Sequence, residues 1–271
     1  MKYALIPLLA ALSVASACDA RSLDEIRSSG TLSVAVYTKF APFSDEARGI
    51  DIDIARALGE KLGVKVSFLP FDADESMDDD LRNMVWKGTV LGYGPADMMM
   101  HVPTEAAFAN RNDQVTILGA YFRDTLQIAR DLARIPELRT IDALANEPVG
   151  VEADSLGAAI LASPSGGHRV TDLHHYTDMN EAFHDLKAGT LSAVLALGTQ
   201  AQAAMSKESG YAVDMAPLAG RVPPAGWTFG LAVKADYKGL AEALDQAMTA
   251  LEQDGTLDAI FASHGVKRLK P

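Results

Sequence analysis

Short apolar runs alternate along the chain with stretches in which apolar residues recur at a helical period. Residues 32–36 and 64–69 have the length and apolar content of strands. Between them, apolar residues recur every fourth position over 50–62, which defines one face of a helix that Gly63 is suited to end. This alternation is typical of βα units built around a mostly parallel sheet.

A second series of the same kind follows the strand expected at 98–102. It contains strands at 149–151 and 193–197, with a helix at 180–187 that Asp178 is placed to cap. Two series of βα units predict two lobes, each with its own sheet.

Two extended segments are expected to join these lobes. The first covers 121–129, and the second covers 220–226, where two adjacent prolines oppose helix formation. A strand at 227–233 then returns the chain to the first lobe, which is therefore discontinuous. The fold class is α/β, two-lobed, with a mostly parallel sheet flanked by helices in each lobe. The expected parts are 31–121 for lobe 1, 122–225 for lobe 2 with the crossing segments, and 226–267 for the return to lobe 1.

The first twenty residues have the features of a signal peptide. Lys2 precedes an apolar run at 4–14, and three small residues follow at 15–17. That run is too short to span a bilayer. Cys18, the single cysteine of the sequence, follows the small residues, so a lipidated N-terminus is an alternative cut, although Ala15 stands where a lipid-attachment box usually has Leu. Export to the periplasm is expected in either case.

Charge excludes one class of partner. The sequence has 24 Lys and Arg against 36 Asp and Glu, a formal net charge of −12. A nucleic-acid-binding surface needs clustered cations to neutralise phosphates, so nucleic acid is not an expected partner.

Several motifs, in their order and spacing, resemble the type II periplasmic solute-binding proteins, in particular family 3, the amino-acid-binding proteins of ABC importers. The resemblance spans nearly the whole chain after the signal peptide. Its motifs are Leu32-Ser-Val-Ala-Val36 with Phe40-Ala-Pro-Phe43, Gly49-Ile-Asp-Ile-Asp-Ile-Ala55, Val149-Gly-Val151, Ala188-Gly189, and Phe229-Gly-Leu-Ala-Val233 with Asp254-Gly-Thr256. The resemblance implies ligand capture by hinge closure, delivery to importer subunits in the membrane, and no catalysis, cofactor or metal.

Two departures from that family concern the ligand. Amino-acid binders have an arginine that pairs with the ligand carboxylate, and Ala107 stands at its position. They also have an aspartate in the second lobe for the ligand ammonium, where this chain has Leu197 or Gly198. Because losing one partner of a buried charge pair costs several kcal/mol, a standard α-amino acid is not the expected ligand.

A subgroup resemblance leads to an alternative function. The segments 97–103 and 195–198 are similar to segments of solute-binding-like proteins associated with quinoprotein dehydrogenases. The chain would then be an accessory protein of a periplasmic alcohol dehydrogenase. A second alternative is a periplasmic dehydratase on the same fold, for which Glu152 or Glu105 would supply the acid or base.

Ligands of such folds bind in the cleft, near the carboxyl ends of strands. On that basis the candidate ligand-binding residues are Tyr37, Phe40, His101, Thr104, Arg123 and Ser155. Phe40 would stack on a flat ligand, with core packing as its alternative. His101 would donate to an anion or be a half-exposed loop residue. Arg123 would pair with an anion more readily than Arg111, which is expected to be a solvated charge. Ser155 would hold an anionic group or cap a helix.

The acidic run at 72–80 has two interpretations. Its oxygens would suit a hard cation, but the run lacks the glycine and the spacing of a calcium loop. A solvated helix start is favoured, and the adjacent His174 and His175 lack the spaced partners of a chelating site.

Overall fold

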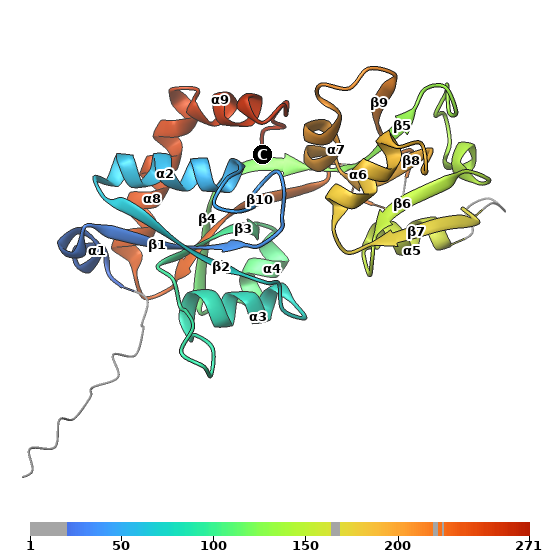
Figure 1. The fold of residues 1–271 in the computed structure, drawn as a ribbon. Coiled ribbons are helices and arrows are strands. Elements are labelled where there is room, and N and C mark those ends of the chain that lie inside the picture. Colours follow the sequence, from blue (N-terminus) through green and yellow to red (C-terminus); the bar gives the residue numbers. More distant parts are fainter. Residues whose placement is uncertain (1–20, 164–168, 219–221, 224) are drawn as a thin grey trace, which may run out of the picture.

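The computed structural model describes residues 21–163, 169–218, 222–223 and 225–271. The proposed signal peptide and Cys18 lie outside these residues. Two lobes stand side by side, joined by extended segments (Figure 1). In lobe 1 the strands are β1 (Thr31–Tyr37), β2 (Lys65–Phe71), β3 (Met98–Pro103), β4 (Val115–Asp124) and β10 (Trp227–Lys234), in the order β2-β1-β3-β10-β4. In lobe 2 they are β5 (Leu126–Asp131), β6 (Pro148–Glu152), β7 (Asp172–Tyr176), β8 (Ala193–Leu197) and β9 (Tyr211–Met215), in the order β7-β6-β8-β5-β9.

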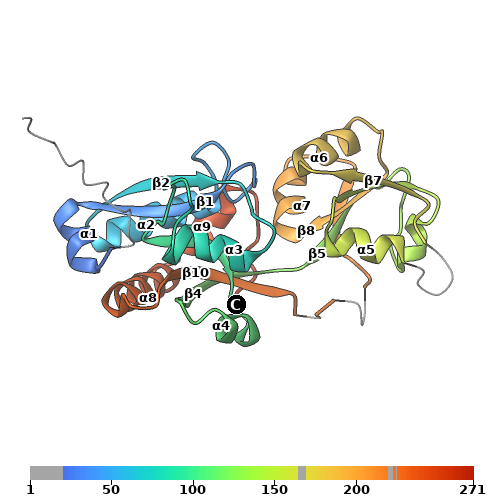
Figure 2. The same ribbon diagram turned by 90° about the horizontal axis from the view of Figure 1, so that it is seen from below.

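Helices cover both faces of each sheet. Lobe 1 has α1 (Leu23–Ser29), α2 (Ile50–Leu62), α3 (Met77–Leu81) continued by a π-helical turn (Arg82–Trp86), α4 (Ala106–Arg111), α8 (Lys238–Gln253) and α9 (Thr256–Ser263). Lobe 2 has a 3₁₀ turn (Ile141–Leu144), α5 (Leu156–Ala162), α6 (Met179–Lys187) and α7 (Gly198–Met205). In lobe 1, α2, α8 and α9 pack on one face and α3 on the other; in lobe 2, α5 packs opposite α6 and α7. In Figure 1, α2 and α9 lie above the strands of lobe 1 and α3 lies below them, and Figure 2 gives the view from the side of α3.

The local signals agree with these elements. Helix α2 begins at Ile50 and ends at Leu62, where Gly63 takes the left-handed conformation, and Asp178 caps α6. Ser76 caps α3 through its side chain. The expected two-lobed α/β fold is confirmed.

The expectation of mostly parallel sheets is wrong in detail, because both sheets are mixed. Strands β1, β2 and β3 pair in parallel, but β10 pairs antiparallel with both β3 and β4. In lobe 2, β5 pairs antiparallel with β8 and β9. Strands β5 and β10, which run against their neighbours, each follow a crossing segment directly, so they enter their sheets without a βα connection.

The chain crosses between lobes where β4 meets β5 at Thr125, and again before β10. At the second crossing, Gly226 has φ 72°, and a Cβ there would lie 2.0 Å from the Asp124 carbonyl oxygen. The two crossings therefore approach each other too closely for any side chain at this position. The C-terminal tail runs beside them: the N–H of Arg123 donates to the Leu269 carbonyl, and that of Lys267 to the Gln202 side chain of α7.

Candidate functional site

A groove of about 300 Å³ has walls from both lobes. Lobe 1 contributes Trp227 and Phe229 of β10, and lobe 2 contributes Leu126, Glu152, Ser155, Leu156, Gly157, Leu195, Ala196 and Leu197. Trp227 and Phe229 are two residues apart on β10, so their side chains share one face of the strand. The lining is apolar and aromatic except at two residues, Glu152 and Ser155.

Glu152 is the charged residue of this groove. It ends β6, is exposed to solvent at the groove, and its carboxylate has no hydrogen-bond or ion-pair partner in the described part of the chain. Partial burial of the carboxyl raises its pKa above the ordinary value, and desolvation is the cause. A carboxylate without a counter-ion beside apolar walls is suited to a positively charged or hydrogen-bond-donating group.

Ser155 serves the backbone. Its Oγ accepts from the N–H of Ala158 at 3.1 Å, which caps α5, and donates to the Glu152 carbonyl at 2.7 Å. The capping alternative is thus realised, and the hydroxyl has no free proton for an anionic ligand in this arrangement. Ser155 is the member of the predicted set that lines the groove.

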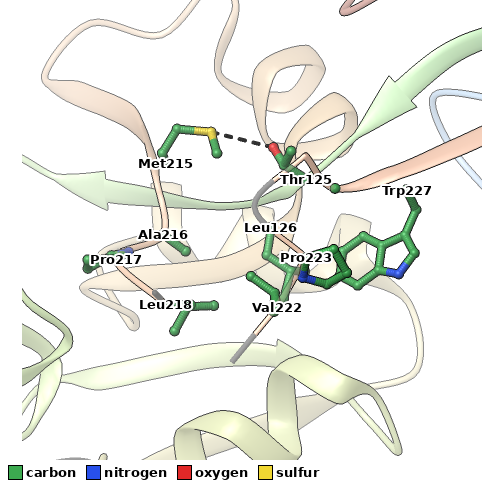
Figure 3. Close-up of a pocket in the computed structure, with 10 residues that line it drawn as sticks. Thr125, Leu126, Met215, Ala216, Pro217, Leu218, Val222, Pro223 and Trp227 are labelled. Atoms are coloured by element: carbon green, nitrogen blue, oxygen red, sulfur yellow. Dashed lines mark hydrogen bonds between the residues drawn. The ribbon is translucent and has the colours of Figure 1, made fainter. Parts of the chain in front are cut away.

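A second cavity of about 300 Å³ lies at the crossing segments (Figure 3). Its lining comes from both crossings and from the segment after β9, namely Thr125, Leu126, Met215, Ala216, Pro217, Leu218, Val222, Pro223, Gly226 and Trp227. Leu126 and Trp227 line both cavities. The two side chains therefore form a shared wall, so rotation of one lobe against the other would change both spaces.

His101 lies in an aromatic cluster behind the groove. It is 4% exposed in β3, with the rings of Phe40, Phe43, Phe122 and Phe229 at centroid distances of 4.3–5.3 Å. The expectation of a half-exposed loop histidine is wrong, because four aromatic rings enclose the imidazole. Phe229 belongs to both the cluster and the groove wall, so it lies between His101 and the groove. Phe40 is partly buried and packs against the core of lobe 1, which is the alternative expected for it.

A buried carboxylate holds His101 in place. Asp51, 1% exposed in α2, lies 3.2 Å from His101 Nδ1 through Oδ2 and accepts 2.6 Å from the Tyr121 hydroxyl through Oδ1. Because a carboxylate only accepts, Nδ1 is the protonated nitrogen. Burial and the Asp51 charge raise the Tyr121 pKa. His101 also has φ 63°, which is unusual for a residue with a Cβ.

The hydroxyls of Tyr37 and Thr104 have partners within lobe 1. Tyr37 donates to Asp80 at 2.7 Å, and its pKa is raised by burial and by that carboxylate. Thr104 donates to the Thr228 carbonyl through Oγ1 at 3.2 Å and through its N–H at 3.0 Å. Both hydroxyls would have to exchange these bonds to contact a ligand.

Arg123 lies on the face of the sheet opposite to the groove. It pairs directly with Thr228, whose side chain alternates with those of Trp227 and Phe229. The guanidinium has no partner within the described residues, but the strand geometry directs it away from this groove. Arg111 is exposed, stacks on Phe108 and pairs with Asp78.

The positions at which the sequence analysis predicts that the two amino-acid anchors are missing differ in setting. Ala107 is exposed in α4, and Leu197 lines the groove. Gly198 begins α7, whose free N–H groups are met by Asp124: the N–H of Thr199 donates to its carboxylate at 3.2 Å. Burial raises the pKa of Asp124. The end of β4 in lobe 1 thereby caps a helix of lobe 2.

The acidic run disperses its carboxylates among separate partners. Asp80 accepts from Tyr37 and from the backbone of Asp74, whereas Asp78 contacts Asn112. Across the described ranges, no three His, Cys, Asp or Glu residues are grouped to hold a metal ion. In the same residues no helix is both long and apolar enough to cross a membrane.

The groove residues Trp227, Phe229, Leu126 and Leu195 were absent from the sequence prediction. The strand over 227–233 was expected, and its alternation already puts Trp227 and Phe229 on one face. Nothing in the sequence indicates which face lies toward lobe 2.

No known family model matches the sequence. The L-cystine-binding protein TcyJ of Escherichia coli K12 is 22% identical over 260 residues, which are 94% of this chain and 90% of that protein. The solved structure of an ancestral cationic amino acid solute-binding protein aligns with a TM-score of 0.71 and 21% identity, over 90% of this chain and 99% of that one. An ancestral arginine-binding protein bound to arginine aligns with a TM-score of 0.58 and 25% identity, over 86% and 97%. By these likenesses, the chain has the two-lobed fold of the amino-acid solute-binding proteins of ABC importers.

Proposed function

We propose that this protein captures a small organic molecule in the periplasm, between its two lobes, and delivers it to an ABC importer. The observation that carries the proposal is the groove whose walls come from both lobes, with Trp227 and Phe229 from lobe 1 and Leu195 and Leu197 from lobe 2. A ligand held by both walls would favour the closed arrangement. Residues 122–225 would then move as lobe 2, with hinges at Thr125 and Gly226.

Closure predicts compaction on binding. Small-angle scattering, with and without a metabolite that stabilises the protein thermally, is expected to show a smaller radius of gyration in the bound state, because only preference for the closed form shifts the equilibrium. A panel in which every stabilising compound leaves the radius unchanged would contradict capture by closure. It would favour instead an accessory protein of a quinoprotein dehydrogenase.

The proposed ligand is not a standard α-amino acid. In support, Leu197 lines the groove where the ligand ammonium would need a carboxylate, and no Arg or Lys is among the residues that line it in the described chain. We expect none of the twenty standard amino acids to raise the melting temperature at low millimolar concentration, since each would bury an unpaired carboxylate. A rise of several degrees with one of them would overturn the assignment of Ala107 and Leu197.

The second candidate function is a periplasmic dehydratase, and one observation favours it. Glu152 lies at the groove with its pKa raised by desolvation, as a general acid requires, whereas Glu105 is exposed before α4. If this function holds, Glu152→Gln abolishes turnover of a bound substrate and leaves binding intact. We expect instead that no substrate is consumed.

A further inference from the structure

The groove is small and mostly apolar, which limits the molecules it can hold. Its volume of about 300 Å³ lies at the small end of the range for ligand pockets. The walls are the aliphatic side chains of Leu126, Leu156, Leu195 and Leu197 and the rings of Trp227 and Phe229. A molecule that fills this space must therefore present an apolar body.

The charged side chains available to that molecule are of one sign. Glu152 supplies a carboxylate with no partner in the described part of the chain, and the Ser155 hydroxyl is already bonded twice to the backbone. Arg123 lies on the other face of its strand. An anionic group in the groove would lose its hydration without gaining a cation, whereas a cation would gain a carboxylate.

The aromatic side chains of the groove also favour a cationic ligand. The faces of Trp227 and Phe229 attract cations through their quadrupoles, and Trp is the most effective side chain for this contact. Glu152 comes from lobe 2 and Trp227 from β10 of lobe 1, so closure would bring an ammonium between opposite walls. The carboxylate and the rings both select against negative charge.

We infer that Glu152 is the specificity-determining residue of the groove and that the ligand is a small monocation with an apolar or aromatic body and no carboxylate. This inference rests on the proposed capture function and narrows it. The ligand class explains why both charged anchors of amino-acid binders are missing at Ala107 and Leu197: a carboxylate is not among the groups to be held, and the cation is held from the end of β6 instead of from the end of β8.

Three compounds that share a phenyl group and differ in charge test this class: 2-phenylethylamine, L-phenylalanine and 3-phenylpropionate. By titration calorimetry at neutral pH, the amine is expected to bind at least about tenfold more tightly than either carboxylate-bearing compound. In Glu152→Gln the affinity for the amine should fall by about tenfold or more. The control is Glu137→Gln, an exposed carboxylate of lobe 2 that pairs with Arg139, and it should leave the affinity unchanged.

Binding of the amine should also depend on pH through Glu152. The ionised carboxylate is the binding form, so affinity is present above its raised pKa and is lost as pH falls through it. The neighbouring titratable groups are Asp154 in the next loop and His174, His175 and Tyr176 on β7, where Tyr176 is bonded to Asp185. Any pH dependence of the amine affinity that comes from these groups would persist in Glu152→Gln. Apart from that, the affinity of this variant should not change with pH.

The outcomes separate this inference from the proposed function. If 3-phenylpropionate or phenylalanine binds better than the amine, or if the amine binds equally well to Glu152→Gln, the ligand class is wrong, and compaction with the better ligand would still support capture. Absence of amine binding up to about 10 mM would also overturn the class. Failure of every metabolite in a broad panel to compact the protein would remove the capture function itself.

Discussion

Asp51→Ala is expected to lower the free energy of unfolding by about 3–5 kcal/mol. The carboxylate of Asp51 is the shared acceptor for His101 Nδ1 and the Tyr121 hydroxyl, all inside lobe 1. Its removal leaves two buried donors without a partner, at about 1–3 kcal/mol each. Chemical denaturation followed by circular dichroism measures the loss.

Two further variants make this result specific. Asp51→Asn keeps an acceptor for Tyr121 and is expected to cost less than the alanine change. Glu60→Gln, on the exposed side of the same helix, should stay within about 0.5 kcal/mol of the native protein. Equal stability of Asp51→Ala and Glu60→Gln would show that the buried cluster contributes nothing.

Arg268→Ala is expected to cost about 2–4 kcal/mol. The guanidinium side chain is 1% exposed and binds three elements: it donates to the Tyr121 carbonyl at 2.8 Å, to Asp258 of α9 at 2.7 Å, and to Glu252 of α8. Truncation leaves a buried carbonyl unpaired and frees the C-terminal tail, which lies beside the first crossing. The matched control is Arg139→Gln, whose exposed pair with Glu137 should contribute little.

The Arg268→Ala variant should also change how the melting temperature falls at acid pH. Lys270 and Arg268 lower the pKa of Glu252, and Arg268 lowers that of Asp258. Carboxyls with lowered pKa stabilise the fold above their unfolded pKa, and this contribution is lost as pH falls through the folded value. Arg268→Ala should therefore weaken the decline in melting temperature below about pH 4.5. An unchanged decline would mean that these carboxyls titrate alike in both states.

Most elements of the fold could be predicted because their signals are local. The fourfold spacing over 50–62 and the cap at Gly63 depend on neighbours along the chain, as does the strand at Ala193–Leu197. The direction of β10 could not be predicted, because an apolar strand has the same sequence pattern whether it pairs in parallel or antiparallel. Only the route of the crossing segments decided it.

The candidate site was predictable in its region and not in its residues. The sequence placed ligand-contacting groups at the carboxyl ends of strands, and Ser155 does line the groove. It could not show that four rings enclose His101, since these rings come from segments up to 189 residues apart, Phe40 and Phe229. Enclosure by distant segments is a property of packing and leaves no local pattern.

By itself the sequence determined the class of the fold and the two lobes, because these follow from the periodicity of apolar residues, and it predicts that both amino-acid anchors are missing. The tertiary structure decided which side chains meet the groove. Alternation on β10 turns Trp227 and Phe229 toward the groove, and the pairing of Arg123 on β4 with Thr228 turns Arg123 away from it. The end of β6 brings Glu152 to the same space without a counter-ion in the described part of the chain. Which face of a strand is buried depends on what packs against it, and that is fixed only when the two lobes are joined.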